Sequence, residues 1–164
     1  WFDALSDNPT EATRVFRECM ELRRLVAVHL APRIDVLSAA PGLMAALDRT
    51  REASTMNELM EADLSFTRVV LDAAGHFGAT ALFNTVETVI RNVPGVADAF
   101  YGDPELLRTS LAGVVAAVAL TGPERDRAML VALERWDEQA AIRFEAFVTS
   151  RARENGARSA KSRA

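Results

Sequence analysis

The chain has 164 residues, of which 49% are hydrophobic and 26% are charged, with a formal net charge of −4. That length and that apolar content suffice for one folded domain and exclude general disorder. Residues 151–164 hold five Lys or Arg and one acid, which leaves 14 basic and 22 acidic residues, a net charge of −8, for residues 1–150. An acidic surface matches nucleic-acid phosphates poorly, so we expect that this chain does not itself grip DNA or RNA.

Other protein classes are excluded by short segments of the sequence. The longest nearly apolar run is Leu111–Leu120, whereas a membrane-spanning helix needs about 20 residues. Cys19 is the only cysteine, so an intrachain disulfide is impossible, and a reducing, cytoplasmic location is the simplest expectation. The start at Trp1 shows neither an initiator Met nor a signal peptide, so we expect an excised fragment.

Apolar residues recur with a period near 3.6, and no alternating strand pattern is present, so the sequence predicts an all-α protein. The first helix is expected from about Pro9, with Asp7 or Asn8 as its cap. Its expected buried stripe, on which Cys19 would be a core thiol, consists of Val15, Cys19, Leu22, Val26 and Leu30. A break is expected at Ala31-Pro32.

The next helices are short in this interpretation. One ends at about Ala39, because Pro41-Gly42 is a typical stop, and another covers Leu43–Arg51. Ser54 or Thr55 then caps a long helix over 56–74, which Gly75 ends.

Three further helices follow in the second half of the chain. They are predicted over about 79–92, over 103–121 with Asp103-Pro104 at the start, and over 124–151. The basic residues 151–164 are expected to form a frayed tail. Because the loops are short, the prediction is an antiparallel bundle of about six to seven helices, with residues 1–150 as a single domain.

Few residues point to catalysis. The chain has no Gly-x-Ser-x-Gly or phosphate-loop motif, and its only histidines, His29 and His76, are distant in sequence. We therefore expect no enzymatic activity and no metal held by histidines.

Polar residues that interrupt apolar helix faces are more informative. Asp63 and Thr67 are four residues apart and share a face, and Arg23 and Trp136 lie within strongly apolar helices. A second polar face, with i, i+4, i+7 spacing, consists of Asn84, Thr88 and Arg91. An inward-facing charge is costly unless it is paired, so these residues suggest a lined cavity, and a solvated polar face is the alternative.

Several of these segments resemble one known family. Residues 61–68 (EADLSFTR) and 72–76 (DAAGH) resemble the Asp-x-x-Phe-His … Ala-Ser-Gly-Asn signature of GntR-type regulators, in their FadR C-terminal or FCD effector-binding domain. Residues 21–24, 114–122 and 128–143 resemble further helices of that domain. The resemblance covers about residues 10–150.

The resemblance implies a helical bundle that lies C-terminal to a winged helix-turn-helix. Such a domain binds a small effector at its centre, contributes to a homodimer, and changes the operator affinity of the DNA-binding domain. DNA would then be contacted only through a domain that is not in this chain.

The resemblance also implies a pocket without metal or other cofactor. Many members hold a divalent metal with one Asp and three His, and only Asp63 matches here. Of the three positions that carry histidine in the family, the first is Thr67 in this chain. The second falls near Ala112 and the third near Trp136. These side chains cannot replace imidazole as metal ligands.

Within the family, the metal-free branch that binds long-chain acyl-CoA is the most similar. Asn84, the loop 100–105 and the aromatic residue Trp136 match that branch. The implied effector is a small anionic metabolite, with a fatty acid or acyl-CoA as the favoured class. Arg23 and Arg91 would anchor its charge, and Asn84 and Thr88 would orient it.

Other interpretations remain open at this point. The bundle could serve only as a dimerisation or protein-interaction module whose interior is filled by its own side chains. A ligand-binding bundle like that of TetR regulators is the main competing fold. A helical enzyme that acts on acyl thioesters is disfavoured, because no nucleophile–base pair is evident.

Overall fold

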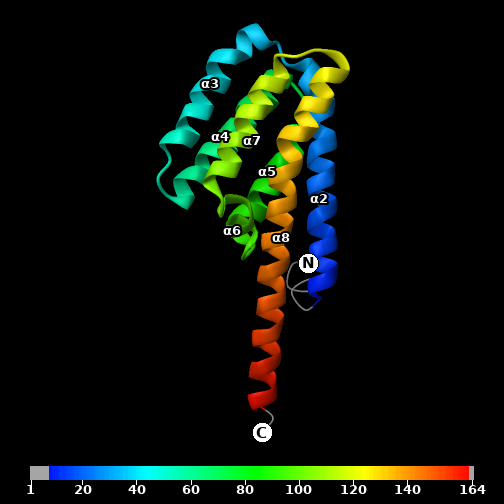
Figure 1. Ribbon diagram of the computed structural model, residues 1–164, viewed down its shortest axis with the longest axis vertical. Helices are drawn as coiled ribbons and strands as arrows, with labels where there is room; N and C mark the ends of the chain where they lie inside the picture. Colours follow the sequence, from blue (N-terminus) through cyan, green and yellow to red (C-terminus); the bar gives the residue numbers. More distant parts are fainter. Residues whose placement is uncertain (1–7, 163–164) are drawn as a thin grey trace.

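A computed structural model describes residues 8–162, which form seven α-helices, one 3-10 helix and no strand. Consecutive long helices run in opposite directions, which confirms the predicted all-α antiparallel bundle (Figure 1). The elements are α2 (Pro9–Leu30), η1 (Ala31–Arg33), α3 (Val36–Glu52), α4 (Met56–Ala74), α5 (Phe77–Asn92), α6 (Val96–Tyr101), α7 (Pro104–Val118) and α8 (Gly122–Ser162).

Three helices begin at caps that the sequence predicted, and one of them ends at a predicted glycine. The side chains of Asn8 and Asp103 cap α2 and α7. Thr55 and Glu58 form a reciprocal capping box at the start of α4. Gly75 ends α4 in the left-handed conformation, with φ of 60°.

The predicted stop at Pro41-Gly42 is wrong, because α3 continues through it from Val36 to Glu52. Pro41 lacks the N–H that would bond to the carbonyl of Leu37, but it lies on the exposed side of the second turn. The opposite side of the helix buries Ala39, Leu43, Ala46 and Leu47, and α3 packs against α4. Burial of that face outweighs the loss of one hydrogen bond.

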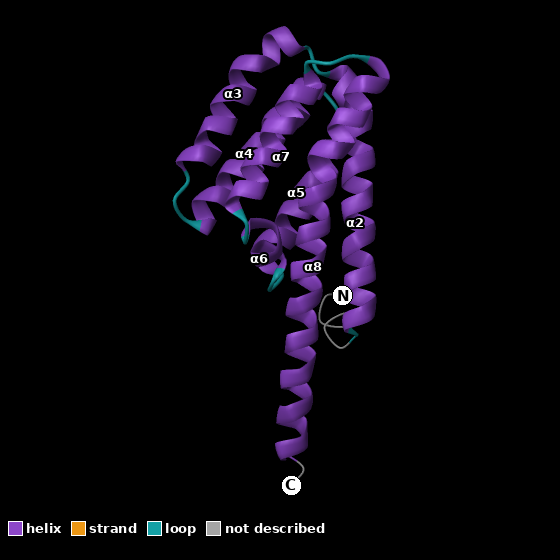
Figure 2. Ribbon diagram, viewed as in Figure 1, coloured by secondary structure: helices purple, strands orange, loops and turns teal. Residues whose placement is uncertain are grey.

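Two other elements differ from the prediction. The short helix α6 was not predicted; it buries Phe100 and Tyr101. α8 does not end near Arg151 but continues to Ser162, through residues that were expected to form a frayed tail. Val148 is the last buried residue among the described side chains of α8, and the C-terminal part of the helix extends away from the bundle (Figure 2).

The orientation of α2 also differs from the prediction. Phe16 and Met20 are its large buried side chains in the first half, whereas Cys19 is exposed and Leu22 is 48% exposed. The expectation of a core thiol is therefore wrong. The stripe that contains Cys19 and Leu22 lies on a different side of α2 from the side that contacts α8.

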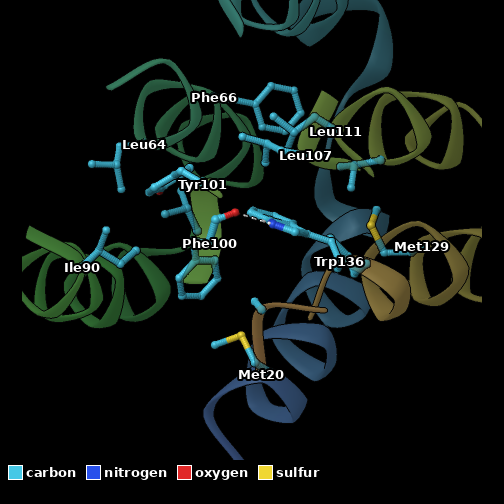
Figure 3. Close-up of a cluster of buried hydrophobic side chains, with 14 of the residues drawn as sticks. Met20, Leu64, Phe66, Ile90, Phe100, Tyr101, Leu107, Leu111, Met129 and Trp136 are labelled. Atoms are coloured by element: carbon cyan, nitrogen blue, oxygen red, sulfur yellow. Dashed lines mark hydrogen bonds between the residues drawn. The ribbon is translucent and has the colours of Figure 1, made fainter. Parts of the chain in front are cut away.

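The core is organised around α8, which packs against α2, α6 and α7. Its Trp136 is 1% exposed and lies among apolar side chains that include Leu107 and Phe100 (Figure 3). Phe144 stacks on Phe16 of α2 at 4.4 Å between ring centroids. Aromatic rings from three helices therefore fill the middle of the bundle.

None of the helices in the described part of the chain has a stretch that is both long enough and apolar enough to cross a bilayer.

Gly95 offers a test of the contact between α6 and α8. Its φ is +79°, and an added Cβ would lie 2.2 Å from the Phe147 ring. Gly95→Ala should lower the free energy of unfolding by about 2–4 kcal/mol, since backbone strain and steric overlap add together. Gly75→Ala is the control, because it has φ of +60° with no atom within 4 Å. Urea denaturation followed by circular dichroism would measure both, and equal losses would contradict the packing described.

Candidate functional site

A buried ion pair joins the first described helix to the last. Asp137 of α8 is 1% exposed, and both of its carboxylate oxygens accept hydrogen bonds from arginines of α2. Arg23 donates to Oδ1, and Arg24 donates to Oδ2 at 2.9 Å. Two guanidinium groups therefore neutralise one buried carboxylate, which is the arrangement that keeps a buried charge tolerable.

The ring of Trp136 contacts the guanidinium group of Arg23. The guanidinium carbon of Arg23 lies 4.2 Å from the centroid of the Trp136 ring, a cation–π geometry. The indole Nε1 donates to the backbone carbonyl of Phe100 at 2.9 Å, as the dashed line in Figure 3 marks. The ring under Arg23 is thereby fixed to α6.

Asp63 of α4 is a second buried carboxyl near this arginine. The hydroxyl of Tyr101 donates to its Oδ2 at 2.9 Å. Burial raises the pKa of Asp63 to about 6, although the charge of Arg23 and the hydrogen bond from Tyr101 act in the opposite direction. Burial also raises the pKa of Tyr101 well above its ordinary value, and the nearby Asp63 adds to that effect.

The network retains one unused donor. The Nε of Arg23 is buried and has no hydrogen-bond partner among the described residues. A buried N–H without an acceptor is uncommon in proteins and costly. The guanidinium of Arg23 is therefore both central and incompletely satisfied.

A hollow of about 260 Å³ opens from the surface onto this pair. Arg24 and Asp137 line it, together with Arg17 and Met20 of α2 and Glu138 of α8. Arg17 donates to both oxygens of Glu138 at 3.0 Å. Most of the charged groups that line the hollow are therefore already paired with one another, whereas Glu21 of α2, which also lines it, forms no ion pair within residues 8–162.

A second hollow of about 320 Å³ lies between α2 and α5 and is almost entirely apolar. His29 and His76 lie at this hollow, with ring centroids 6.1 Å apart. His76 has a structural role as the cap of α5, where its Nδ1 accepts from the N–H of Ala79 at 3.1 Å. Both hollows open to the surface.

The predicted site residues separate into two groups. Arg23 lies over the ring of Trp136 and its charge acts on Asp63, but none of these three residues lines either hollow. Thr67 lies one turn after Asp63 on α4 and is half-buried. These four residues come from three different helices.

The residues predicted on α5 lie in a different environment. Asn84 and Thr88 are exposed, and the hydroxyl of Thr88 donates to the backbone carbonyl of Asn84. Arg91 forms ion pairs with Glu61 of α4 and with Glu87 one turn earlier. The structure does not place any of the three in contact with Arg23.

Sequence reasoning missed Asp137 and Tyr101. Asp137 follows Leu133 by four residues on the buried stripe of α8, so it is an acid at an inward position. That criterion singled out Asp63 and would also have found Asp137. Tyr101 had no such signal, because its position depends on the unpredicted helix α6.

The positions where the resembling family holds a metal carry no imidazole here. The resemblance assigns one of them to Thr67 and another to the neighbourhood of Trp136, and Trp136 uses its only donor on Phe100. Within residues 8–162, no group of three or more His, Cys, Asp and Glu side chains is arranged to hold a metal ion.

The pKa of Asp63 gives a prediction for the pH dependence of stability. Between about pH 4, the ordinary range of an aspartate, and pH 6, the folded protein keeps a proton on Asp63 that the unfolded chain releases. Rising pH should therefore lower the stability across this window by up to about 3 kcal/mol. Asp63→Asn keeps an acceptor for Tyr101 and removes the charge, so it should stabilise the protein at pH 8 and change little at pH 4.5. Urea denaturation at both pH values measures this; an equal effect at both would contradict it.

The ion pair of Asp137 gives a second prediction. Asp137→Ala should cost about 3–5 kcal/mol, because it leaves Arg23 and Arg24 next to a buried site without a counter-charge. Asp48→Ala, which removes an exposed pair with Arg51, should cost less than about 1 kcal/mol. Thermal denaturation at low and high salt would compare them, and similar losses would show that the buried pair contributes little.

Compared with known proteins, the sequence matches no family model and no curated protein, and the fold matches no solved structure.

Proposed function

We propose that this bundle is the ligand-sensing domain of a GntR-type transcriptional regulator, not an enzyme, that acts in the cytoplasm. It binds a small anionic metabolite without a metal, and a fatty acid or acyl-CoA is the first class to test. Ligand binding changes the affinity of an upstream winged helix-turn-helix for its operator. A homodimer is the working form of such a regulator.

The observation that carries the proposal is the Arg23 network, of which Arg24 and Asp137 line a surface hollow. Stability alone does not require buried charges, since apolar side chains of similar size are often as stabilising. Arg23 has a buried unused N–H, a nearby aromatic face and a partner, Asp137, that it shares with Arg24. Perturbed, partly satisfied charges next to a hollow are typical of binding sites.

The proposed mechanism is an exchange of partners. An anionic group that reaches Arg23 replaces Asp137 there, while Arg24 continues to neutralise Asp137. Because this pair connects α2 to α8, the exchange favours a different packing of the two helices. The ligand shifts the population only as far as its affinities for the two arrangements differ.

A second candidate function is a dimerisation module that binds no small molecule. It is favoured by the aromatic filling of the interior, with Trp136 1% exposed, and by the fact that both hollows open to the surface. Under this proposal, the buried charges serve only to fix the pairing of α2 with α8.

Titration calorimetry with oleate and with oleoyl-CoA tests the first proposal. Arg23→Gln should weaken binding at least about tenfold, since hydrogen bonds to charged groups contribute about 1.5–3 kcal/mol. Arg33→Gln, at an exposed arginine of η1, is the matched control and should bind as the wild type does.

Each outcome separates the two candidate functions. Equal affinity of the wild type and Arg23→Gln would exclude Arg23 as the anchor. If neither probe binds, and native mass spectrometry of the purified protein shows no retained small molecule, the dimerisation module is the better description.

A further inference from the structure

The C-terminal part of α8, residues 149–162, leaves the bundle and is basic. It follows Val148 and extends alone beyond the other helices (Figure 1). We call residues 149–162 the α8 extension. It holds three arginines and one lysine against one acid, a net charge of +3, whereas residues 1–148 hold 14 basic and 22 acidic residues, a net charge of −8. The sign of the charge therefore reverses where the helix leaves the bundle.

The first two arginines of the α8 extension are available to a partner. Arg151 and Arg153 are exposed, and neither forms an ion pair within residues 8–162, although Glu154 is close in sequence. Exposed, unpaired arginines on one short segment create a local positive potential that attracts anions. The partner that fits the extension by charge is therefore an anion with several charges in a row.

The composition of the α8 extension argues against an apolar contact with a membrane or a protein groove. Its only apolar side chains are those of three alanines, Ala152, Ala157 and Ala160. A helix that lies on a bilayer or in a protein groove uses large apolar residues as anchors. The other side chains of the extension are mainly Arg, Lys, Ser and Asn, which donate hydrogen bonds to phosphate oxygens in protein–DNA complexes.

The acidic bundle of a second copy is a weaker counterpart than a nucleic acid. Exposed acids of the bundle already pair with arginines of the same copy, and these pairs include Arg14–Glu18, Arg17–Glu138 and Arg91–Glu61. A duplex, in contrast, carries one uncompensated phosphate charge for about every 1.7 Å of its axis. Charge complementarity therefore favours phosphates over a second copy.

We propose that the α8 extension binds the phosphates of duplex DNA along the major groove. Its 14 residues form a helix about 21 Å long, and that length of duplex carries about 12 phosphates. An α-helix about 10–12 Å wide, which small side chains keep narrow, matches a major groove about 12 Å wide. The expected contact is with the backbone and is not specific for sequence.

The distance between the α8 extension and the bundle makes this contact compatible with an acidic protein. The expectation that the chain does not grip nucleic acid came from the charge of residues 1–150, most of which form the bundle. The far end of the extension lies about 21 Å from the level of Val148, about two Debye lengths at physiological salt. Repulsion between the bundle and the duplex is largely screened at that distance. The inference rests on this chain alone and depends neither on the effector nor on an upstream DNA-binding domain.

Fluorescence anisotropy of the full chain with a labelled duplex tests the proposal across a range of salt concentrations. For the wild type, log K should fall with log salt with a slope of about −3 to −4, since each phosphate contact contributes about −0.9. Arg151→Gln/Arg153→Gln should reduce the slope by about 2 and weaken binding at least about tenfold at low salt. Arg33→Gln/Arg127→Gln is the matched control, because it removes the same charge from two exposed arginines outside the extension, and it should keep the wild-type slope.

Several results would overturn the proposal. The wild type could fail to bind the duplex at about 20 mM salt, or Arg151→Gln/Arg153→Gln could leave the slope unchanged. Tighter binding to phosphatidylserine vesicles than to the duplex would make a membrane surface the partner. Self-association that the same variant abolishes, without any binding of the duplex, would make a second copy the partner. Far-UV circular dichroism checks that each variant folds, and the readout is separate from the titration that tests effector binding.

Discussion

Asp137 is the group on which the arrangement of the bundle depends, because its charge lies inside and requires a partner there. Arg23 and Arg24 of α2 provide it, and the chain between α2 and α8 includes all the other described helices. A misaligned α2 would leave an unpaired charge in the core, which costs more than a small loss of apolar contact. The ion pair therefore specifies the alignment of α2 and α8, while the stacked rings of Phe16 and Phe144 provide the apolar burial around it.

The same interior limits what the protein can bind. Trp136, Phe100 and Tyr101 are buried in the middle of the bundle, and the carboxylate of Asp137 nearby already has two arginine partners. A ligand in this region must displace a side chain or an ion-pair partner. The binding energy would then be reduced by the cost of that displacement, so a moderate affinity is expected even for a ligand that fits well.

The sequence was most informative where structure is determined locally. The caps at Asn8, Thr55 and Asp103 depend on side chains within three residues, and the structure has all of them. Contacts distant in sequence decided the rest. Packing of α3 on α4 carries the helix through Pro41, and the aromatic rings of α8 select Phe16 over Cys19 as the inner side of α2.

For the candidate site, sequence reasoning found two polar residues that interrupt apolar faces, the half-buried Arg23 and the buried Asp63. It could not separate them from Asn84 and Thr88, because an exposed polar face and a lined cavity have the same helical spacing. The position of α5 at the edge of the bundle makes the distinction, and that position depends on packing with α4 and α6.

The length of α8 gives the ion pair a mechanical effect at a distance. Asp137 is buried in the core, and α8 continues from it to Ser162. At 1.5 Å per residue, Ser162 is about 37 Å away. A straight helix transmits a tilt along its whole length. A rotation of α8 by about 10° at Asp137 would therefore move its C-terminal end by about 6 Å. That displacement is several times the distance that atoms move when a hydrogen bond exchanges partners. A change in the contact of Asp137 with Arg23 and Arg24 would thus be amplified at the end of α8 by the length of the helix.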